Sequence, residues 1–273
     1  MAGALRTLGG VGGHFGAPHV GRMTSRPLYD TIGRGYDAHR RPDPRIAAAI
    51  ADALGAAASV VNVGAGAGSY EPADRPVVAV EPSPAMLRQR RPGTAPAVQA
   101  SATDLPFRDA AFGAALAVLT VHHWPDRARG LGELARVTRE RVVILTWDPA
   151  AVFRFWLVDD YFPELVTLDR DIFPTLEELR RALGRIEVRP VLVPHDCVDG
   201  FLGAYWRRPQ AYLDAGVRGA ISTFSKLADA EPGLARLRAN LADGTWERRH
   251  GHLRARDAID LGYRLVVAKH VDA

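Results

Sequence analysis

The stretch SVVNVGAGAG at residues 59–68 decides the fold, because a short β-branched apolar run leads directly into closely spaced glycines. Residues 59–63 predict a buried strand of a parallel sheet, since such strands are apolar on both faces. Gly64, Gly66 and Gly68 predict a tight turn in which backbone N–H groups can approach a ligand closely. The dinucleotide pattern G-x-G-x-x-G would need a glycine at position 69, where this chain has Ser69. The spacing is G-x-G-x-G instead, which on its own also suits a purely structural turn.

Strands and helices alternate on either side of this motif. Further strands are expected at residues 77–80, 97–100, 114–121 and 141–147. Helices are expected at residues 45–54, 85–90 and 129–138. The alternation predicts βαβ units with right-handed crossovers, and therefore an α/β, doubly wound fold. Two more strands, expected at 186–193 and 263–270, complete a mostly parallel seven-stranded sheet.

The start and the second half of the chain have less regular patterns. Residues 1–24 are rich in glycine without periodicity and predict a flexible leader. Residues 25–273 are expected to form a single domain, since nothing marks a linker. Within it, an aromatic insertion at about 148–185 predicts a lid over a substrate. The segment at about 199–242 predicts two helical stretches, roughly at 200–214 and 221–242.

Composition argues against several classes of protein. The 273 residues are 47% hydrophobic and 24% charged, which is typical of a soluble globular protein. No apolar run approaches the roughly 18 residues of a membrane span, and no signal-peptide pattern is visible. The single cysteine, Cys197, favours a reducing cytoplasm, and no metal-ligand spacing is recognisable. The net charge is +4 with acids interleaved among the arginines, so we expect no nucleic-acid partner.

Two carboxylates follow predicted strands at the edge where the glycines lie. Glu81 comes directly after AVAV, where its side chain can accept hydrogen bonds from both hydroxyls of a ribose. Asp104 lies in SATDLPF after the next strand, where it can accept a hydrogen bond from an exocyclic amine. A solvated loop carboxylate is the alternative interpretation of Glu81.

Taken together, VVNVGAGAG, AVEPS, ASATDLPF and LAVLTVHHWPD resemble the motifs of class I S-adenosylmethionine-dependent methyltransferases of the bacterial small-molecule type. The resemblance covers roughly residues 29–147, in the family's order and spacing. It implies a Rossmann-like methyltransferase fold, S-adenosyl-L-methionine as the cofactor, and an enzyme that transfers a methyl group. Asn62 departs from the family, which usually has an acid there, although an amide can still form hydrogen bonds.

The same resemblance implies which residues hold the cofactor. Gly64–Gly68 lie under its methionine part, Glu81 holds the ribose and Asp104 contacts the adenine amine. The segment YDTIGRGYDAHRRPDP resembles the helix that closes over the cofactor, and an arginine there can grip a carboxylate through two hydrogen bonds. An amphipathic surface helix is the alternative. The full set of expected cofactor residues is Tyr36, Arg40, Asn62, Gly64, Ala65, Gly66, Gly68, Glu81, Pro82, Met86, Thr103, Asp104, Leu105 and Leu119.

Candidate catalytic residues are His122 and His123, with Tyr29 from the closing segment. The two histidines follow the strand expected at 114–121, and ligands of open α/β sheets bind at the carboxyl ends of strands. A neutral imidazole there can deprotonate the acceptor as the methyl group is transferred. Methyl transfer from a sulfonium can also proceed through positioning and exclusion of water, without a base.

Aromatic residues of the insertion are expected to choose the substrate, because they can line an apolar pocket. Some of them must instead belong to the core; Phe153 and Trp156, for example, are spaced as on one face of a helix. The candidate substrate-binding residues are Trp147, Phe153, Trp156, Tyr161 and Tyr205. They predict a small, aromatic or otherwise apolar methyl acceptor. A role in specialised metabolism is expected by analogy, from a composition typical of high-GC bacteria, and we expect a monomer or homodimer.

Three alternatives stay open at this point. A nicotinamide-dependent oxidoreductase could use a similar sheet, although Ser69 argues against it. A nucleic-acid methyltransferase is disfavoured by dispersed arginines and by LTVHHW in place of N/D-P-P-Y/W. The departure at Asn62 raises the third, a non-catalytic methyltransferase-like subunit.

Overall fold

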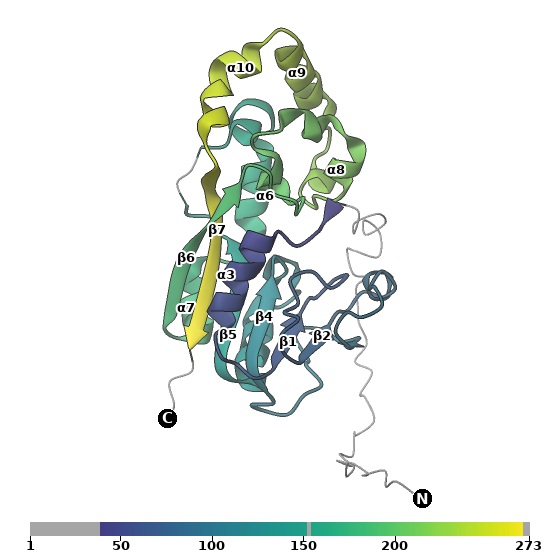
Figure 1. Ribbon diagram of the computed structural model, residues 1–273, viewed down its shortest axis with the longest axis vertical. Helices are drawn as coiled ribbons and strands as arrows, with labels where there is room; N and C mark the ends of the chain where they lie inside the picture. The colour runs from purple at the N-terminus through teal and green to yellow at the C-terminus, as the bar shows by residue number, and fades with distance from the viewer. Residues whose placement is uncertain (1–38, 152–153, 270–273) are drawn as a thin grey trace, which may run out of the picture.

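Seven strands form one sheet in the part of the chain that the computed structural model describes, residues 39–151 and 154–269. They are β1 Val60–Val63, β2 Val77–Val80, β3 Ala97–Val98, β4 Phe112–Val118, β5 Thr138–Trp147, β6 Ile186–Pro194 and β7 Ala258–Lys269. Their spatial order is β3-β2-β1-β4-β5-β7-β6. Strands β1 to β5 pair in parallel, and β7 is antiparallel to both β5 and β6. The predicted α/β, doubly wound and mostly parallel seven-stranded sheet is confirmed (Figure 1).

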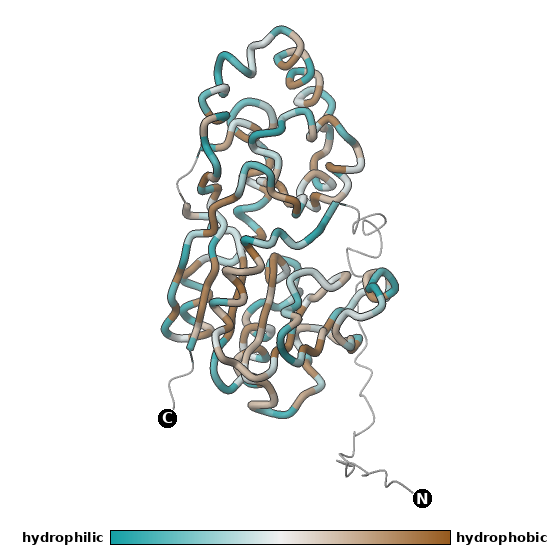
Figure 2. Tube along the Cα trace, in the orientation of Figure 1, coloured by the Kyte–Doolittle hydropathy of each residue, from teal (hydrophilic) through white to brown (hydrophobic). Residues whose placement is uncertain are grey.

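The centre of the sheet is covered on both faces, which explains its continuous apolar runs. Every residue of β1 is buried. Val60 belongs to a core with Ile46, Ile50 and Leu54 of helix α3 Pro44–Leu54, whereas Val61 and Val63 belong to a second core with helix α5 Arg127–Val137. Alternate residues of the strand therefore face two different cores, and Figure 2 shows the hydrophobic colouring running along the strands.

Helix boundaries follow local sequence signals. Helix α3 begins after Asp43, whose side chain accepts a hydrogen bond from the N–H of Arg45, and it ends at Gly55. Helix α7, Leu176–Leu183, begins with a complete capping box formed by Thr175 and Glu178. Helix α7 lies against α5 and β6. This part of the insertion predicted at 148–185 therefore covers the sheet and not the substrate.

The cap, which we define as residues 154–172 and 200–255, gathers at one end of the sheet (Figure 1). Its interior is built from large side chains that are almost completely buried, among them Trp156, Trp206, Tyr212 and Trp246. Its elements are a π-helix Leu157–Tyr161, α6 Glu164–Ile172, α8 Ala215–Gly219, α9 Glu231–Ala242, α10 Thr245–His250 and 3-10 helices Leu202–Tyr205, Pro209–Leu213, Phe224–Lys226 and Gly251–Ala255.

Several element predictions need correction. Residues 200–214, predicted as one helical stretch, form two short 3-10 helices, and the segment 221–242 contains a 3-10 turn followed by α9. Helix α10 and the early start of β7 at Ala258 were not predicted. Strand β4 ends at Val118, because Leu119 has a φ of +48° and the chain then forms the 3-10 helix Val121–His123. The short helix α4 spans only Pro84–Leu87.

The strand order creates a switch point between β1 and β4. From β1 the chain proceeds to β2 and β3 on one side, whereas β4 and β5 lie on the other side. The loops that leave β1 and β4 therefore diverge at the carboxyl ends of two neighbouring strands. Open α/β sheets bind their ligands at such a crevice.

Candidate functional site

The glycine loop after β1 is fixed by its backbone. The N–H groups of Gly64 and Ala65 both donate to the carbonyl oxygen of Val80, over 2.8 and 3.0 Å. Gly64 has a φ of +73°, and a Cβ atom placed on it would lie 2.0 Å from Thr120 Oγ1. Only glycine fits there, because the loop after β1 and the segment after β4 approach each other so closely.

Glu81, directly after β2, is bound to the same loop. Its Oε2 accepts a hydrogen bond from the N–H of Gly66 over 2.8 Å, and its Oε1 accepts one from the N–H of Ser83 over 2.9 Å. These contacts fix the orientation of the Glu81 side chain beside the loop. Met86 of α4 lies under the loop, since a Cβ atom on Gly66 would be 3.3 Å from its Cε. Pro82 connects β2 to this helix.

A buried ion pair that we did not predict supports the glycine loop from behind. Arg90 donates to both carboxylate oxygens of Glu71, at 2.8 and 3.0 Å, and both side chains are less than 10% exposed. Arg90 also donates to the carbonyl oxygens of Gly66 and Ala95. No motif marks this pair, because its partners are nineteen positions apart in the sequence, with β2 and α4 between them.

The segment after β3 is held by helix α5. The N–H of Leu105 donates to Glu133 Oε2 over 2.8 Å, and Arg136 donates to the carbonyl oxygens of Leu105 and Phe107. Thr103 is fixed by Ser101, whereas the side chain of Asp104 is exposed. The fixed backbone thus presents the Asp104 carboxylate to the outside.

Asn62 lies in the middle of β1 and is 1% exposed. Its Nδ2 atom is buried and has no hydrogen-bond partner within the described residues. An unpartnered buried amide is unfavourable by about 1–3 kcal/mol. A ligand or a bridging water at this end of the sheet would satisfy it.

An apolar cavity lies between the carboxyl ends of β4 and β5 and the cap. Its empty space, including the open mouth, is about 690 Å³. Leu119 and His122 line it from the segment after β4, Trp147 from β5, and Phe173 and Phe201 from the cap side. Trp147 is the expected substrate residue that the structure places in this wall, and its indole N–H donates to the carbonyl oxygen of Leu261 over 2.9 Å.

The two histidines differ in their surroundings. His122 lines the cavity, stacks on Phe173 with 3.9 Å between ring centroids, and has a buried Nδ1 without a partner among the described residues. Burial, reinforced by His123 and Lys226, holds the pKa of His122 well below its usual value. Burial lowers the pKa of His123 to about 3. Both rings are therefore neutral at neutral pH.

Three expected substrate residues lie in the cap interior and do not line the cavity. The indole N–H of Trp156 donates to the carbonyl oxygen of Trp206 over 2.7 Å, and the hydroxyl of Tyr161 accepts from Asn240. Tyr205 packs against Tyr212 and lies under the Arg208 guanidinium. Their surroundings agree with the alternative interpretation, in which these aromatic residues belong to the core. Tyr29, Tyr36 and Phe153 lie outside the described residues.

Arg40 lies in the cavity wall and is bound to Asp199, directly before the second segment of the cap. It forms an ion pair with Asp199, whose other carboxylate oxygen accepts a hydrogen bond from Tyr70 over 2.9 Å. Arg40 and Asp199 also form an isolated antiparallel bridge. Because Tyr70 lies just after the glycine loop, this network connects the loop to Asp199, the residue that directly precedes the second segment of the cap.

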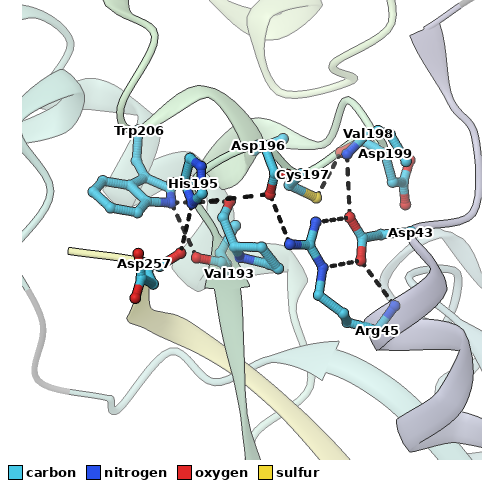
Figure 3. Close-up of polar contacts among 12 residues, drawn as sticks. Asp43, Arg45, Val193, His195, Asp196, Cys197, Val198, Asp199, Trp206 and Asp257 are labelled. Carbon is cyan, nitrogen blue, oxygen red and sulfur yellow. Dashed lines mark hydrogen bonds and ion pairs between the residues drawn. The ribbon is translucent and has the colours of Figure 1, made fainter. Parts of the chain in front are cut away.

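A neighbouring network ties α3 to the segment after β6 (Figure 3). The fully buried Asp43 accepts hydrogen bonds from the Arg45 side chain at 2.8 and 3.0 Å and from the N–H of Val198 at 3.3 Å. Arg45 also pairs with Asp196. Although burial opposes it, these hydrogen bonds lower the pKa of Asp43.

Asp169 of α6 is a cavity residue that sequence reasoning missed. It is 7% exposed, and its Oδ1 accepts a hydrogen bond from the Thr223 hydroxyl over 2.8 Å. Burial raises its pKa to about 6, against the opposing effects of Thr223 and Lys226. The available signal was the pair Leu165 and Asp169, which places an acid on the buried face of an amphipathic helix.

The described residues contain no cluster of three or more potential metal ligands. Among them there is also no helix long and apolar enough to cross a membrane.

Comparisons with known proteins agree with this geometry. A family model described as a methyltransferase domain matches residues 61–146. The crystal structure of a candidate methyltransferase from an antibiotic biosynthesis pathway of Anabaena variabilis is 34% identical, with a TM-score of 0.79, over 84% of this chain and 98% of that chain. A Thermotoga maritima protein described as a SAM-dependent methyltransferase, possible histamine N-methyltransferase, is 19% identical with a TM-score of 0.45 over 61% of this chain and 82% of that chain.

Proposed function

The chain belongs to the class I S-adenosylmethionine-dependent methyltransferases, and we propose that it transfers the methyl group to a small, largely apolar acceptor bound in the cavity under the cap. S-adenosylmethionine is the cofactor of this family, and the family assignment argues against the nicotinamide-dependent alternative. The similar Anabaena protein is described as part of an antibiotic biosynthesis pathway. That description supports a small-molecule acceptor here.

The residues around the glycine loop fit this cofactor. The glycines at 64, 66 and 68 let the loop backbone approach a ligand closely, and the Glu81 carboxylate is held beside Gly66, where it can accept hydrogen bonds from ribose hydroxyls. The exposed Asp104 is available to an adenine amine, and the unpartnered Nδ2 of Asn62 can donate a hydrogen bond. Thr103, Leu105, Pro82, Met86 and Leu119 would complete the surroundings.

One observation carries the proposal: the apolar cavity borders the switch point at which the glycine loop lies. Leu119 and His122 line the cavity and follow β4, and β4 is hydrogen-bonded to β1. Thr120, between these two residues, touches the glycine loop at Gly64. An acceptor in the cavity would therefore lie next to a cofactor on the loop.

The bound cofactor supplies an electrophilic methyl group on a sulfonium. The protein's contribution is then to orient the acceptor and to exclude water, which the apolar walls formed by Trp147, Phe173 and Phe201 can do. His122 is neutral and can accept a hydrogen bond through Nδ1. Its strongly lowered pKa makes it a weak base, because a general base works best with a pKa near the working pH.

Calorimetry with S-adenosylmethionine and S-adenosylhomocysteine tests the cofactor site. We expect Gly66→Asp to abolish binding, because its carboxylate would lie beside Glu81 and Met86 in the loop. Gly132→Asp is the matched control, since Gly132 is exposed on α5 with open space around it. Failure of a folded wild-type sample to bind either compound would refute the proposal.

Mass spectrometry then tests the transfer itself, as the gain of one CH₂ by members of an acceptor panel. Tight cofactor binding without turnover of any acceptor would favour the remaining alternative, a non-catalytic methyltransferase-like subunit.

A further inference from the structure

Among the described residues that line the cavity, one carboxylate, that of Asp169, interrupts the apolar wall. Asp169 and Leu165, one helical turn apart, are the buried residues of α6, and both line the cavity. A carboxylate is almost never buried in an apolar wall without a paired cation, because burial disfavours its charge. Among the described residues Asp169 forms no ion pair, so its position calls for a further partner.

The protein satisfies only one side of this carboxylate. Oδ1 accepts a hydrogen bond from Thr223, whereas Oδ2 has no hydrogen bond and no ion pair with any residue in 39–151 or 154–269. An ionised carboxylate can accept about four hydrogen bonds. Oδ2 thus offers acceptor capacity to a molecule in the cavity.

The charges around the cavity favour a neutral partner. Lys226, three residues after Thr223, is half-buried and acts electrostatically on Asp169, so the negative charge is already partly balanced. Arg40 is held by Asp199 and adds positive potential. Both of these positive charges would repel a cationic acceptor, whereas they would not repel a neutral hydrogen-bond donor.

We propose that the acceptor is a neutral, mostly aromatic or aliphatic molecule with a hydroxyl group, and that this hydroxyl donates a hydrogen bond to Oδ2 of Asp169, which receives its proton during methylation. This inference rests on the proposed function. The rest of the acceptor would lie against the apolar wall, with Phe173 and Trp147 near its rings.

The proposed step balances. The O–H bond of the acceptor breaks and its proton passes to Asp169 Oδ2, from which it is later lost to solvent. A bond forms between the acceptor oxygen and the methyl carbon. The sulfur–carbon bond breaks, and its electron pair stays on sulfur as the sulfonium becomes a neutral thioether. Asp169 then touches the reacting group and is a catalytic residue.

Binding to the enzyme loaded with S-adenosylhomocysteine provides a test that does not depend on turnover. The probes are 2-naphthol, 2-naphthylamine and 2-methylnaphthalene, which share one shape. We expect wild-type protein to bind 2-naphthol at least about tenfold more tightly than 2-methylnaphthalene, in line with one hydrogen bond to a charged group. Asp169→Asn should remove this preference, because it turns the acceptor at Oδ2 into an amide donor.

The pH dependence of methylation separates a catalytic role from a structural one. The titratable groups around Asp169 are His122 and His123 after β4, Lys226, Arg40 and Tyr263. The rate of 2-naphthol methylation in wild type should rise as the pH passes through about 6, where Asp169 loses its proton. Asp169→Asn should lower the rate by about 10²–10⁴-fold and remove this limb of the profile.

Asp160→Asn is the matched control, because Asp160 is a largely buried cap carboxylate that pairs with Arg249 and His250 and does not line the cavity. Its pH profile should match wild type. Equal binding of the three probes, no 2-naphthol binding by protein that binds S-adenosylhomocysteine, or an unchanged profile in Asp169→Asn would overturn the inference. Loss of S-adenosylhomocysteine binding by wild type would instead refute the proposed function.

Discussion

Replacing Gly64 by alanine should test how closely the two loops of the switch point fit together. The new Cβ atom would lie 2.0, 2.8 and 2.9 Å from Oγ1, Cβ and Cγ2 of Thr120. Ordinary carbon contacts are about 3.5–4.0 Å, so the Thr120 side chain and its backbone must move by more than 1 Å, roughly. Thr120 is 9% exposed and has little space to yield.

The expected cost has two parts. An alanine at the φ of +73° that Gly64 adopts costs about 1–2 kcal/mol. Overpacking against Thr120 adds about 1–3 kcal/mol. We therefore expect Gly64→Ala to lower the free energy of unfolding by about 2–5 kcal/mol, measured by urea denaturation, and to weaken S-adenosylmethionine binding.

Two variants separate these parts. Gly93→Ala is the control, because Gly93 has a φ of +88° with no atom within 4 Å of its built Cβ. Gly93→Ala should lower the free energy of unfolding only by the conformational cost of alanine at a positive φ, about 1–2 kcal/mol. In the double variant Gly64→Ala with Thr120→Ala the closest contact disappears, so the two changes should couple favourably by about 1–2 kcal/mol. Strict additivity, or a Gly64→Ala cost no larger than that of Gly93→Ala, would refute the close approach.

The remaining predictions concern three buried charges. Arg90→Met should lower the free energy of unfolding by about 3–5 kcal/mol, because Glu71 would be left buried and unpaired, and the double variant with Glu71→Met should recover most of this loss in urea denaturation. Asp43→Asn should cost about 1–3 kcal/mol at pH 7 through lost hydrogen bonds to Arg45 and Val198. Because the pKa of Asp43 is lowered in the folded state, the ionised carboxylate stabilises the fold fully above its unfolded pKa of about 4, and this stabilisation disappears as the pH falls further. An Asp43→Asn variant that loses as much stability at pH 2.5 as at pH 7 would contradict this prediction. Asp169→Asn should raise the free energy of unfolding by about 3 kcal/mol at pH 8, because a pKa raised to about 6 makes the charged carboxylate unfavourable in the folded state. Below pH 4 the substitution should have no such effect. An unchanged thermal midpoint of the variant at pH 8 would contradict this prediction.

The sheet and the glycine loop could be predicted because their signals are local. Strands such as 60–63 are uninterrupted apolar runs that end in turn residues, and this pattern arises wherever both faces of a parallel strand are covered. The position of Glu81 after β2 followed from the same pattern, and its contact with Gly66 places it beside the loop.

The cap could not be predicted in the same way, because its contacts join residues far apart in sequence. Trp156 bonds to Trp206 and packs against Trp246, and nothing in the local sequence distinguishes such a core aromatic from Trp147, which lines the cavity. Both kinds of residue need an apolar environment. Only the path of the chain through 154–172 and 200–255 decides which of them face the cavity.

Asp169 shows why a polar residue in an apolar pattern is informative once its surroundings are known. Leu165, four residues earlier, occupies the same wall at no electrostatic cost, so an apolar residue at 169 would pack and stabilise the cap better. Burial raises the pKa of Asp169, which means that the charged carboxylate is unfavourable at this position in the folded state. Residues that oppose stability at the wall of a cavity are expected where binding or chemistry requires them, because only a ligand can supply the missing interaction. The carboxylate lies in the cap, whereas the glycine loop lies at the switch point next to Thr120, so the reacting atoms of acceptor and cofactor would meet only when both parts of the fold are assembled.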